Sequence, residues 1–389
     1  MRFRHEDGTV VHLAYGTNVL PAQDVEGLAA QATAFGDMLR TELGVPRVGL
    51  GLWLPAAAAH RLAAEPAEVA RLRDLLAAHG VEIVTVNAFP YADFQGDVVK
   101  KDVYQPAWNE RARLDYTVDA ATVLAGLLPD DAVRGSISSL PLGWHAPWLA
   151  DRQSAAVDHL NELAEALDKL EAETGRAIRV GLEPEPGCAI ETIADAAERL
   201  AEVDRNRIGV CLDLCHLAVE FEDVEGALAH LAEAGLSVVK TQPAAALHID
   251  KPGDEATRHA LSQYAEDRFL HQVRSLGRNR LATRDDLPDA LTGRRPLHTG
   301  SPWRVHYHVP VHADPEPPLR STRDELQQSL RSLLGGARAQ VDHLEVETYT
   351  WSVLPGGGAR DDAALAKGLA AELAHVRDEL IGLGLKEVA

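Results

Sequence analysis

Short apolar segments alternate with longer amphipathic segments along most of the chain. Residues 48–54 and 81–86 are apolar runs of strand length, and residues 69–79 between them repeat apolar positions at helical spacing before Gly80, a typical C-terminal cap. Strands that alternate with helices in this way indicate a parallel sheet with right-handed crossovers, and the number of units favours a closed (β/α)8 TIM barrel. The other predicted strands are 11–15, 135–140, 178–182, 207–212, 236–242 and 343–348, and the other predicted helices are 25–43, 109–128, 155–174, 193–203, 224–234, 322–334 and 362–380.

The alternation breaks between residues 243 and 320, where the sequence shows no clear βα unit. This segment predicts an insertion in the seventh βα loop, which would place it over the C-terminal face of a single barrel spanning residues 1–389. Within it we expect a short helix at 257–264, a hairpin at 271–283 and an alternating strand at 303–310.

A long connection, from Asn87 to Trp108, follows the third strand and contains several aromatic residues. Long loops without structure of their own are usually functional in compact domains. We therefore expect this connection to cover the mouth of the barrel.

The charge balance narrows the classes of partner. Aspartate and glutamate number 59 against 38 lysine and arginine, a net charge of −21, whereas phosphate binding depends on lysine and arginine. The balance argues against a nucleic-acid surface. Since the sequence also shows neither a secretory signal nor a membrane-length apolar run, we expect a cytoplasmic protein that is not embedded in a membrane.

Acidic side chains stand at the ends of three predicted strands. Glu183 and Glu185 follow the strand at 178–182, Asp213-x-x-His216 follows the next strand, and Glu345 and Glu347 end the last strand. The C-terminal ends of barrel strands meet at one face, where such folds keep their chemistry. Charged groups there are costly unless they are paired or bind metal. The pattern predicts one divalent cation held by these groups.

Strand side chains alternate, so Lys240 and Gln242 share a face, as do His306 and His308. Lys240 is a candidate for catalysis or for neutralising Glu185 or Glu345, and both histidines could instead be ordinary strand residues. Oxygen and imidazole ligands suit manganese, magnesium, iron, cobalt or zinc. The three cysteines, Cys188, Cys211 and Cys215, are better interpreted as buried structural thiols than as zinc ligands.

The order of Glu183, Asp213-x-x-His216 and a terminal glutamate resembles xylose-isomerase-like barrels, which include sugar isomerases, ketose epimerases and endonuclease-IV-type enzymes. The run 183–186 looks like the Glu-Pro-Lys-Pro of xylose isomerases, with Glu185 in place of the lysine. Epimerases of the group have a histidine metal ligand on strand seven, where this chain has Gln242. The resemblance therefore implies either an altered set of metal ligands or that His308 takes the place of this histidine.

Six further motifs occur in one order along the chain: residues 12–18, 87–91, 182–188, 211–216, 305–310 and 345–351. Together they resemble the EboE family of metabolite-traffic proteins. The resemblance implies a xylose-isomerase-like barrel encoded with a set of proteins, including a UbiA-like membrane prenyltransferase, that make or move a secondary metabolite.

Three functions remain open from the sequence. The first is a metal-dependent isomerase or epimerase of a small hydroxycarbonyl metabolite, in which Glu183, Asp213, His216 and Glu347, with Gln242 or His308, hold the ion. Glu185, Lys240 or Glu345 would move the proton, and the resemblance to ketose epimerases implies that Glu183 and Glu347 do both jobs. The second is a metal-dependent hydrolase of a small phosphoester or lactone. The third is a binding or carrier barrel without catalysis.

Overall fold

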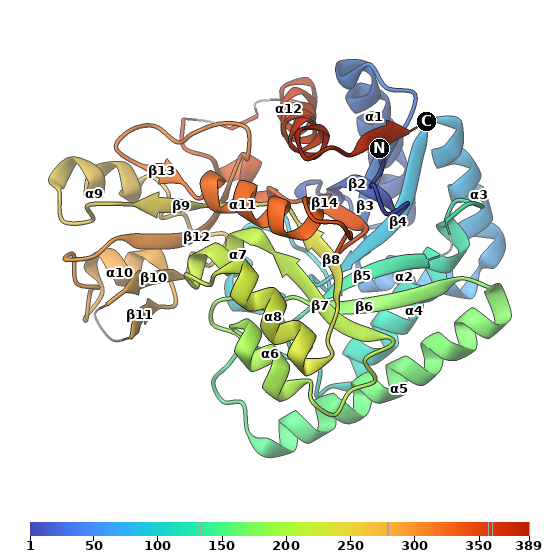
Figure 1. Cartoon of the computed structure of the whole chain (residues 1–389), viewed down its shortest axis with the longest axis horizontal. Coiled ribbons are helices and arrows are strands. Elements are labelled where there is room, and N and C mark those ends of the chain that lie inside the picture. Colours follow the sequence, from blue (N-terminus) through green and yellow to red (C-terminus); the bar gives the residue numbers. More distant parts are fainter. Residues whose placement is uncertain (133, 278–279, 357, 360, 389) are drawn as a thin grey trace.

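The structure is a computed structural model that describes residues 1–132, 134–277, 280–356, 358–359 and 361–388. Its central feature is a closed barrel of eight parallel strands, in which the last strand pairs with the first (Figure 1). The predicted TIM barrel is therefore confirmed. The barrel strands are β2 (Val10–Gly16), β3 (Val48–Trp53), β4 (Val81–Ala88), β5 (Arg134–Ser139), β6 (Ala177–Leu182), β7 (Ile208–Asp213), β8 (Val238–Gln242) and β14 (His343–Val346).

Helices cover the outside of the barrel between these strands (Figure 1). Local sequence explains their ends: in α1, Asp24 accepts a hydrogen bond from the backbone of Gly27 at the start, and Gly44 adopts the left-handed conformation at the end. The helices are α1 (Val25–Leu43), α2 (Ala56–Ala64), α3 (Pro66–Ala78), α4 (Arg111–Leu127), α5 (Ala150–Thr174), α6 (Ile193–Arg199), α7 (Leu214–Val219), α8 (Val224–Ala234), α11 (Arg323–Leu334) and α12 (Asp362–Gly382).

Some details differ from the sequence-based expectation. Helix α2 was not predicted, and α5 begins five residues earlier than expected, at Ala150. The connection after β4 is not free of structure, because Lys100–Tyr104 form a turn of 3₁₀ helix. The last barrel strand ends at Val346, so Glu347 lies just beyond it.

Between β8 and β14 the chain forms a second, five-stranded antiparallel sheet (Figure 1). Its central strand β12 lies between β10 and β9, with Val305 opposite both Val273 and Leu247. This sheet contains the expected hairpin strands and the alternating strand; positions 278–279 of the hairpin lie outside the described residues. The strands of this sheet are β9 (Ala245–Ile249), β10 (Val273–Leu276), β11 (Leu281–Arg284), β12 (Trp303–Val309) and β13 (Arg320–Ser321), and the same segment contains the helices α9 (Glu255–Ser262) and α10 (Leu287–Thr292).

Two short antiparallel strands extend the barrel sheet beside β2. These are β1 (Arg2–Arg4), which pairs with β2, and β15 (Lys386–Val388), which pairs with β1. Within the described parts of the chain, we find no helix with both the length and the apolar character needed to cross a lipid bilayer.

Candidate metal centre

The end of β6 delivers two buried glutamates. The backbone N–H of Glu183 still donates to the Ser139 carbonyl of β5, at 3.0 Å, so its position continues the barrel ladder. Glu185 is held two residues later by a backbone hydrogen bond to Ile190. Both side chains are at least 95 % buried, as expected for residues that point into the mouth of the barrel.

The motif Asp213-x-x-His216 forms the junction between β7 and α7. Asp213 is the N-cap of the helix, and its Oδ1 atom accepts from the backbone N–H groups of Cys215, at 2.7 Å, and of His216, at 3.0 Å. This cap holds His216 close to the aspartate. The second carboxylate oxygen, Oδ2, is buried without a hydrogen-bond partner.

Glu347 lies immediately after β14 and receives three amide donors. Asn87 donates to its Oε1 atom at 3.1 Å, and the side-chain amides of Asn18 and Gln242 also donate to this carboxylate. Because the Glu347 carboxylate accepts several hydrogen bonds, these bonds favour its ionised form and fix its orientation.

Three of these carboxylates converge. One oxygen of each of Glu183, Asp213 and Glu347 lies within 4.8 Å of the other two. Burial, together with the neighbouring carboxylates, raises the pKa of Glu183 and of Glu347 well above the usual value, and burial also raises the pKa of Asp213. Glu183 Oε2 and Asp213 Oδ2 have no partner. A divalent cation satisfies this arrangement, since it offsets the mutual repulsion and supplies the missing contact.

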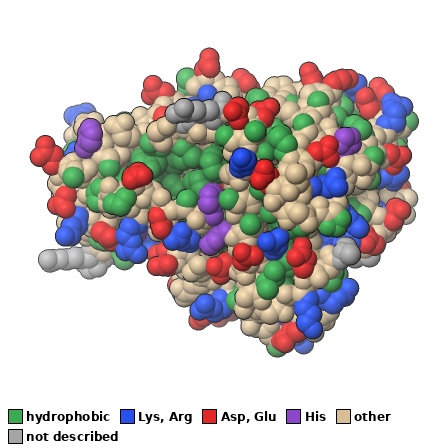
Figure 2. Space-filling model, turned by 90° about the horizontal axis from the view of Figure 1, so that it is seen from above, with side chains coloured by type: hydrophobic (Ala, Val, Ile, Leu, Met, Phe, Trp, Pro, Cys, Tyr) green, Lys and Arg blue, Asp and Glu red, His purple; other side chains and the backbone are tan. Residues whose placement is uncertain are grey.

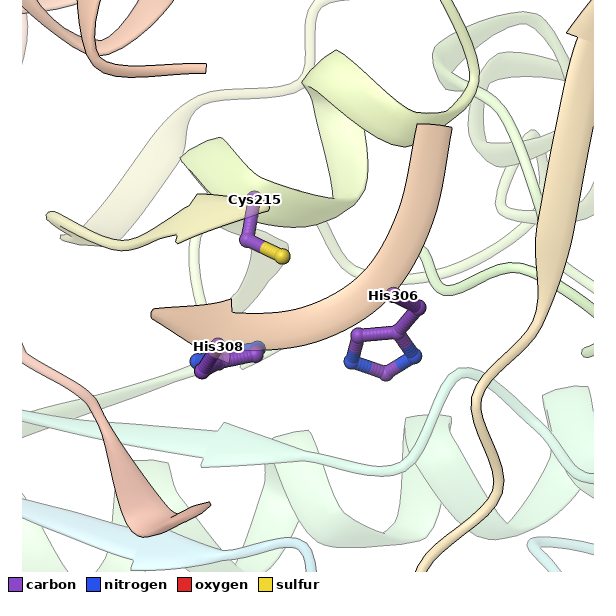
Figure 3. Close-up of side chains that lie close together, drawn as sticks. All are labelled: Cys215, His306 and His308. Carbon is purple, nitrogen blue, oxygen red and sulfur yellow. The ribbon is translucent and has the colours of Figure 1, made fainter. Parts of the chain in front are cut away.

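Three imidazoles lie beside the carboxylates. His216 comes from α7, while His306 and His308 come from β12 of the second sheet; Figure 3 shows the two β12 rings on one side of their strand, with Cys215 of α7 nearby. Adjacent ring centroids are 4.5 Å apart for His216 and His306 and 5.3 Å for His306 and His308. The strand alternation that the sequence indicated therefore brings both β12 histidines to the barrel site.

The hydrogen bonds of these rings fix their tautomers. The Nδ1 atom of His216 lies 3.1 Å from the Pro184 carbonyl oxygen, and that of His308 lies 2.8 Å from the Glu347 carbonyl oxygen. Carbonyl oxygens only accept, so each Nδ1 carries the proton and each Nε2 presents a lone pair. Metal-binding histidines typically donate their other N–H to a carbonyl in this way.

His306 follows the same rule. Its Nδ1 atom lies 2.7 Å from Gln272 Oε1, and the orientation of that amide is set because Gln272 Nε2 donates to the Pro186 carbonyl. His306 Nε2 then faces His216 Nε2 at 3.0 Å, so two acceptors meet. His308 Nε2 is buried without a partner.

Burial keeps these imidazoles neutral. It lowers the pKa of His216 to about 3, lowers that of His308 to about 4, and lowers that of His306 well below its usual value. Neutral imidazoles are the form that binds metal. The lone pair of His308 Nε2, which has no donor, and the nearby lone pair of His216 Nε2 therefore fit a cation, and nitrogen with oxygen ligands suits zinc, manganese, iron or cobalt.

The structure arranges the predicted ligands in two overlapping groups. Asp213 belongs to both: it groups with Glu183 and Glu347, and also with His216 and His308. Gln242 lies at the site, but its oxygen faces the Cys211 thiol at 2.6 Å and its nitrogen faces Glu347, which leaves no free amide oxygen. Cys215 lies within 4.8 Å of the β12 imidazoles, but burial raises the pKa of its thiol well above normal.

Lys240 and Glu345 lie together inside the barrel and do not line the pocket. Lys240 Nζ lies 2.8 Å from Glu345 Oε2 and 3.2 Å from Ser138 Oγ. Burial alone would lower the pKa of Lys240, but Glu345 and further acidic neighbours outweigh it and raise this pKa. The structure thus pairs the lysine with Glu345 rather than with Glu185.

Glu185 has a different environment. Its Oε1 atom accepts from the Tyr104 hydroxyl at 2.7 Å, and Gln272 Nε2 donates to that hydroxyl at 2.9 Å. Burial raises the pKa of Glu185 to about 8, although the Tyr104 hydrogen bond opposes the shift. Sequence reasoning did not find Tyr104 or Gln272, since both lie in connections whose course a hydrophobic pattern does not determine.

A pocket opens above these groups. The empty space in and above it is about 500 Å³, open solvent included, and Glu183, Glu185, His216, His306 and Glu347 form its polar floor. Aromatic side chains from the connection after β4 line it too, as predicted for that loop. Figure 2 shows one face of the molecule, where histidine side chains lie beside a hollowed hydrophobic area with charged residues around it.

Solved structures share this fold. A D-psicose 3-epimerase structure determined in the presence of D-fructose is 15 % identical, with a TM-score of 0.50, and covers 95 % of this chain and 99 % of its own. An L-ribulose 3-epimerase is 12 % identical, with a TM-score of 0.50 and 96 % of each chain covered. The IolI protein, described with a bound zinc atom, is 12 % identical, with a TM-score of 0.50 and 95 % and 98 % covered. At these identities the likeness is one of fold.

The sequence was also compared with curated proteins and with protein families. No curated protein matches it. The family described as "Xylose isomerase-like TIM barrel" matches residues 41–276, which is more than half of the chain. The closed eight-stranded barrel agrees with this match. The chain therefore belongs to the xylose isomerase-like TIM barrel family.

Proposed function

We propose that this protein is a divalent-metal-dependent isomerase or epimerase of a small hydroxycarbonyl metabolite. The observation that carries the proposal is the convergence of Glu183, Asp213 and Glu347 within 4.8 Å, next to a pocket that Glu183 and Glu347 line. One buried oxygen each of Glu183 and Asp213 has no hydrogen-bond partner. The fold shared with two ketose 3-epimerases supports the reaction class.

Glu183, Asp213 and Glu347 would hold the ion, with His216 and His308 on the side of Asp213. Of the two candidates for the strand-seven position, His308 fits a ligand role better than Gln242, because its Nε2 atom is buried and free. A divalent ion in this position supplies Lewis acidity, which polarises a carbonyl and acidifies the adjoining C–H bond. Gln242, Asn18 and Asn87 orient the Glu347 carboxylate toward the centre.

Glu185 is the candidate for moving the proton. It lines the pocket, whereas Lys240 and Glu345 are tied to each other outside the lining. With a pKa of about 8, Glu185 exchanges a proton near neutral pH, which is the range in which general acid–base catalysis is most efficient. The Tyr104 hydroxyl, itself fixed by Gln272, holds the carboxylate in place.

The resemblance to the EboE family extends the proposal. On that basis the metabolite belongs to a secondary-metabolite pathway, and the protein acts with other proteins of the same set. We further propose, on separate grounds of sequence, that it acts in the cytoplasm.

Metal content and solvent exchange test the proposal together. Elemental analysis of the purified protein should find one or more equivalents of divalent metal, with a clear loss in Asp213→Ala. Asp158→Ala, which removes an exposed aspartate of α5, is the matched control and should retain the metal. A metal content unaffected by Asp213→Ala would contradict the centre.

Turnover is followed as deuterium uptake by a hydroxycarbonyl compound in D₂O, read by NMR. We expect uptake that requires metal and falls about 100-fold or more in Glu185→Gln. Metal-loaded protein that binds such compounds without any exchange would instead favour a carrier.

A further inference from the structure

The pocket has an aromatic roof above its polar floor. Phe94, from the connection after β4, contacts Phe269 and Tyr349 with ring centroids 5.2 and 5.1 Å apart, and Phe269 contacts Tyr349 at 4.9 Å. All three rings line the pocket and are more than 90 % buried. A ligand that fills the space therefore meets both the polar groups and these ring surfaces.

The two tyrosines of the pocket direct their polar atoms to the floor. The Tyr104 hydroxyl donates to Glu185, and the Tyr349 hydroxyl lies 3.4 Å from His306 Nε2. Both hydroxyl groups therefore already face partners on the floor, Glu185 and His306, and the roof offers few polar atoms to a ligand. Aromatic walls of this kind favour rings and other flat apolar groups.

Lys100 is the only lysine or arginine among the described residues that line the pocket. Its Nζ atom donates to Asp286 Oδ2 at 2.8 Å, to the Phe269 carbonyl at 2.7 Å and to the Glu266 carbonyl at 3.3 Å. An ammonium group has three N–H donors, so all of them are used. Lys100 holds the roof segment at 266–269 and has no donor left for a ligand.

This occupied cation matters because the floor is acidic. Phosphate groups are normally recognised by free arginine or lysine side chains or by backbone N–H groups at helix N-termini. A divalent ion held by Glu183, Asp213 and Glu347 would offset two of their three negative charges when all are ionised. A phosphate dianion would then still meet a net negative group of carboxylates, and no free cationic side chain lies among the described lining residues to compensate.

We propose that the substrate is an unphosphorylated hydroxycarbonyl compound that carries a ring or comparable apolar group. The inference rests on the proposed function for the position of the hydroxycarbonyl end over the floor. It excludes sugar phosphates and small phosphoesters as ligands of the pocket, and it assigns Phe94, Phe269 and Tyr349 to the recognition of the apolar part.

Three probes with one common hydroxyketone group test it: dihydroxyacetone, dihydroxyacetone phosphate and 2-hydroxyacetophenone. Binding to the full-length, metal-loaded protein is measured by calorimetry, with metal content checked on the same sample. We expect 2-hydroxyacetophenone to bind at least about tenfold more tightly than dihydroxyacetone, because its phenyl ring is buried against the roof. The phosphate ester should bind no better than dihydroxyacetone.

Variants of the lining residues test which side chains account for the tighter binding of the phenyl compound. Phe94→Ala and, as a milder change, Phe269→Leu should reduce the advantage of the phenyl compound while leaving the affinity for dihydroxyacetone within about twofold. Lys100→Met should not weaken the binding of the phosphate ester relative to dihydroxyacetone.

Any of four results would overturn the inference. The phosphate ester could bind most tightly of the three probes, or its binding could be lost selectively in Lys100→Met. The phenyl compound and dihydroxyacetone could bind with equal affinity, or protein that holds its metal could bind none of the probes. The last result would leave the metal centre intact, whereas a protein without metal would refute the proposed function instead.

Discussion

Lys240 and Glu345 form an ion pair inside the barrel, with Nζ and Oε2 2.8 Å apart and neither side chain exposed to solvent. Removal of one partner leaves a buried charge uncompensated, so Lys240→Met should lower the free energy of unfolding of the metal-free protein by about 3–5 kcal/mol. Urea denaturation measures this loss. The double variant Lys240→Met/Glu345→Met replaces both charges with side chains of similar length and should recover most of it. A double variant that loses as much as the two single changes summed would show that the residues act independently.

Gly51 of β3 faces the same carboxylate. A Cβ atom at this position would overlap the side chain of Glu345, and the nearest overlapping atom, Oε2, is the one that accepts from Lys240. Gly51→Ala should therefore destabilise the protein by about 1–3 kcal/mol, the usual range for overpacking. The control is Gly382→Ala in α12, where an added Cβ has no neighbour within 4 Å and should be neutral or stabilising. Equal unfolding midpoints for the two variants would contradict this explanation.

The raised pKa of Glu185 predicts how pH affects the metal-free protein. The carboxyl has a reference pKa of 4.5 and a pKa of about 8 when folded, so between these values the folded state binds more protons than the unfolded state. Stability contributed by this group is then lost as pH rises from about 4.5 to 8. Glu185→Gln removes this dependence, so its advantage over the native protein should grow across that range, up to an amount on the order of 5 kcal/mol at about 1.4 kcal/mol per pKa unit.

Chelator-treated protein, unfolded thermally at several pH values, provides the measurement. Glu165→Gln, an exposed position on α5, is the control and should track the native protein. A difference between Glu185→Gln and the native protein that stays constant with pH would contradict the assigned shift.

Hydrophobic periodicity predicted the barrel because apolar strands such as β3 alternate along the chain with amphipathic helices such as α1. It failed where alanine dominates. Helix α2 begins with four alanines, and its buried face consists of Ala58, Ala59 and Leu62, so the sequence marks it only weakly. Strand β9 begins with Ala245 and Ala246, which resemble loop or helix sequence as much as strand. Their structure depends on the elements packed against them.

The sequence predicted those residues of the candidate site that stand at the ends of barrel strands. Glu183 and Glu347 follow β6 and β14 directly and Asp213 is the last residue of β7, so barrel closure brings them together. Tyr104 and Gln272 reach Glu185 from the connections before α4 and β10, and no periodic pattern determines where such connections lie. The positions of the carboxylates relative to the imidazoles also depend on side-chain hydrogen bonds, which the sequence pattern does not determine.

The origin of the imidazoles has a consequence for the rigidity of the molecule. His306 and His308 belong to the five-stranded sheet, whereas Glu183 and Asp213 belong to the barrel. An ion with ligands from both would act as a cross-link between the two sheets. Amide hydrogens of β12 should then exchange more slowly with solvent when the metal is present.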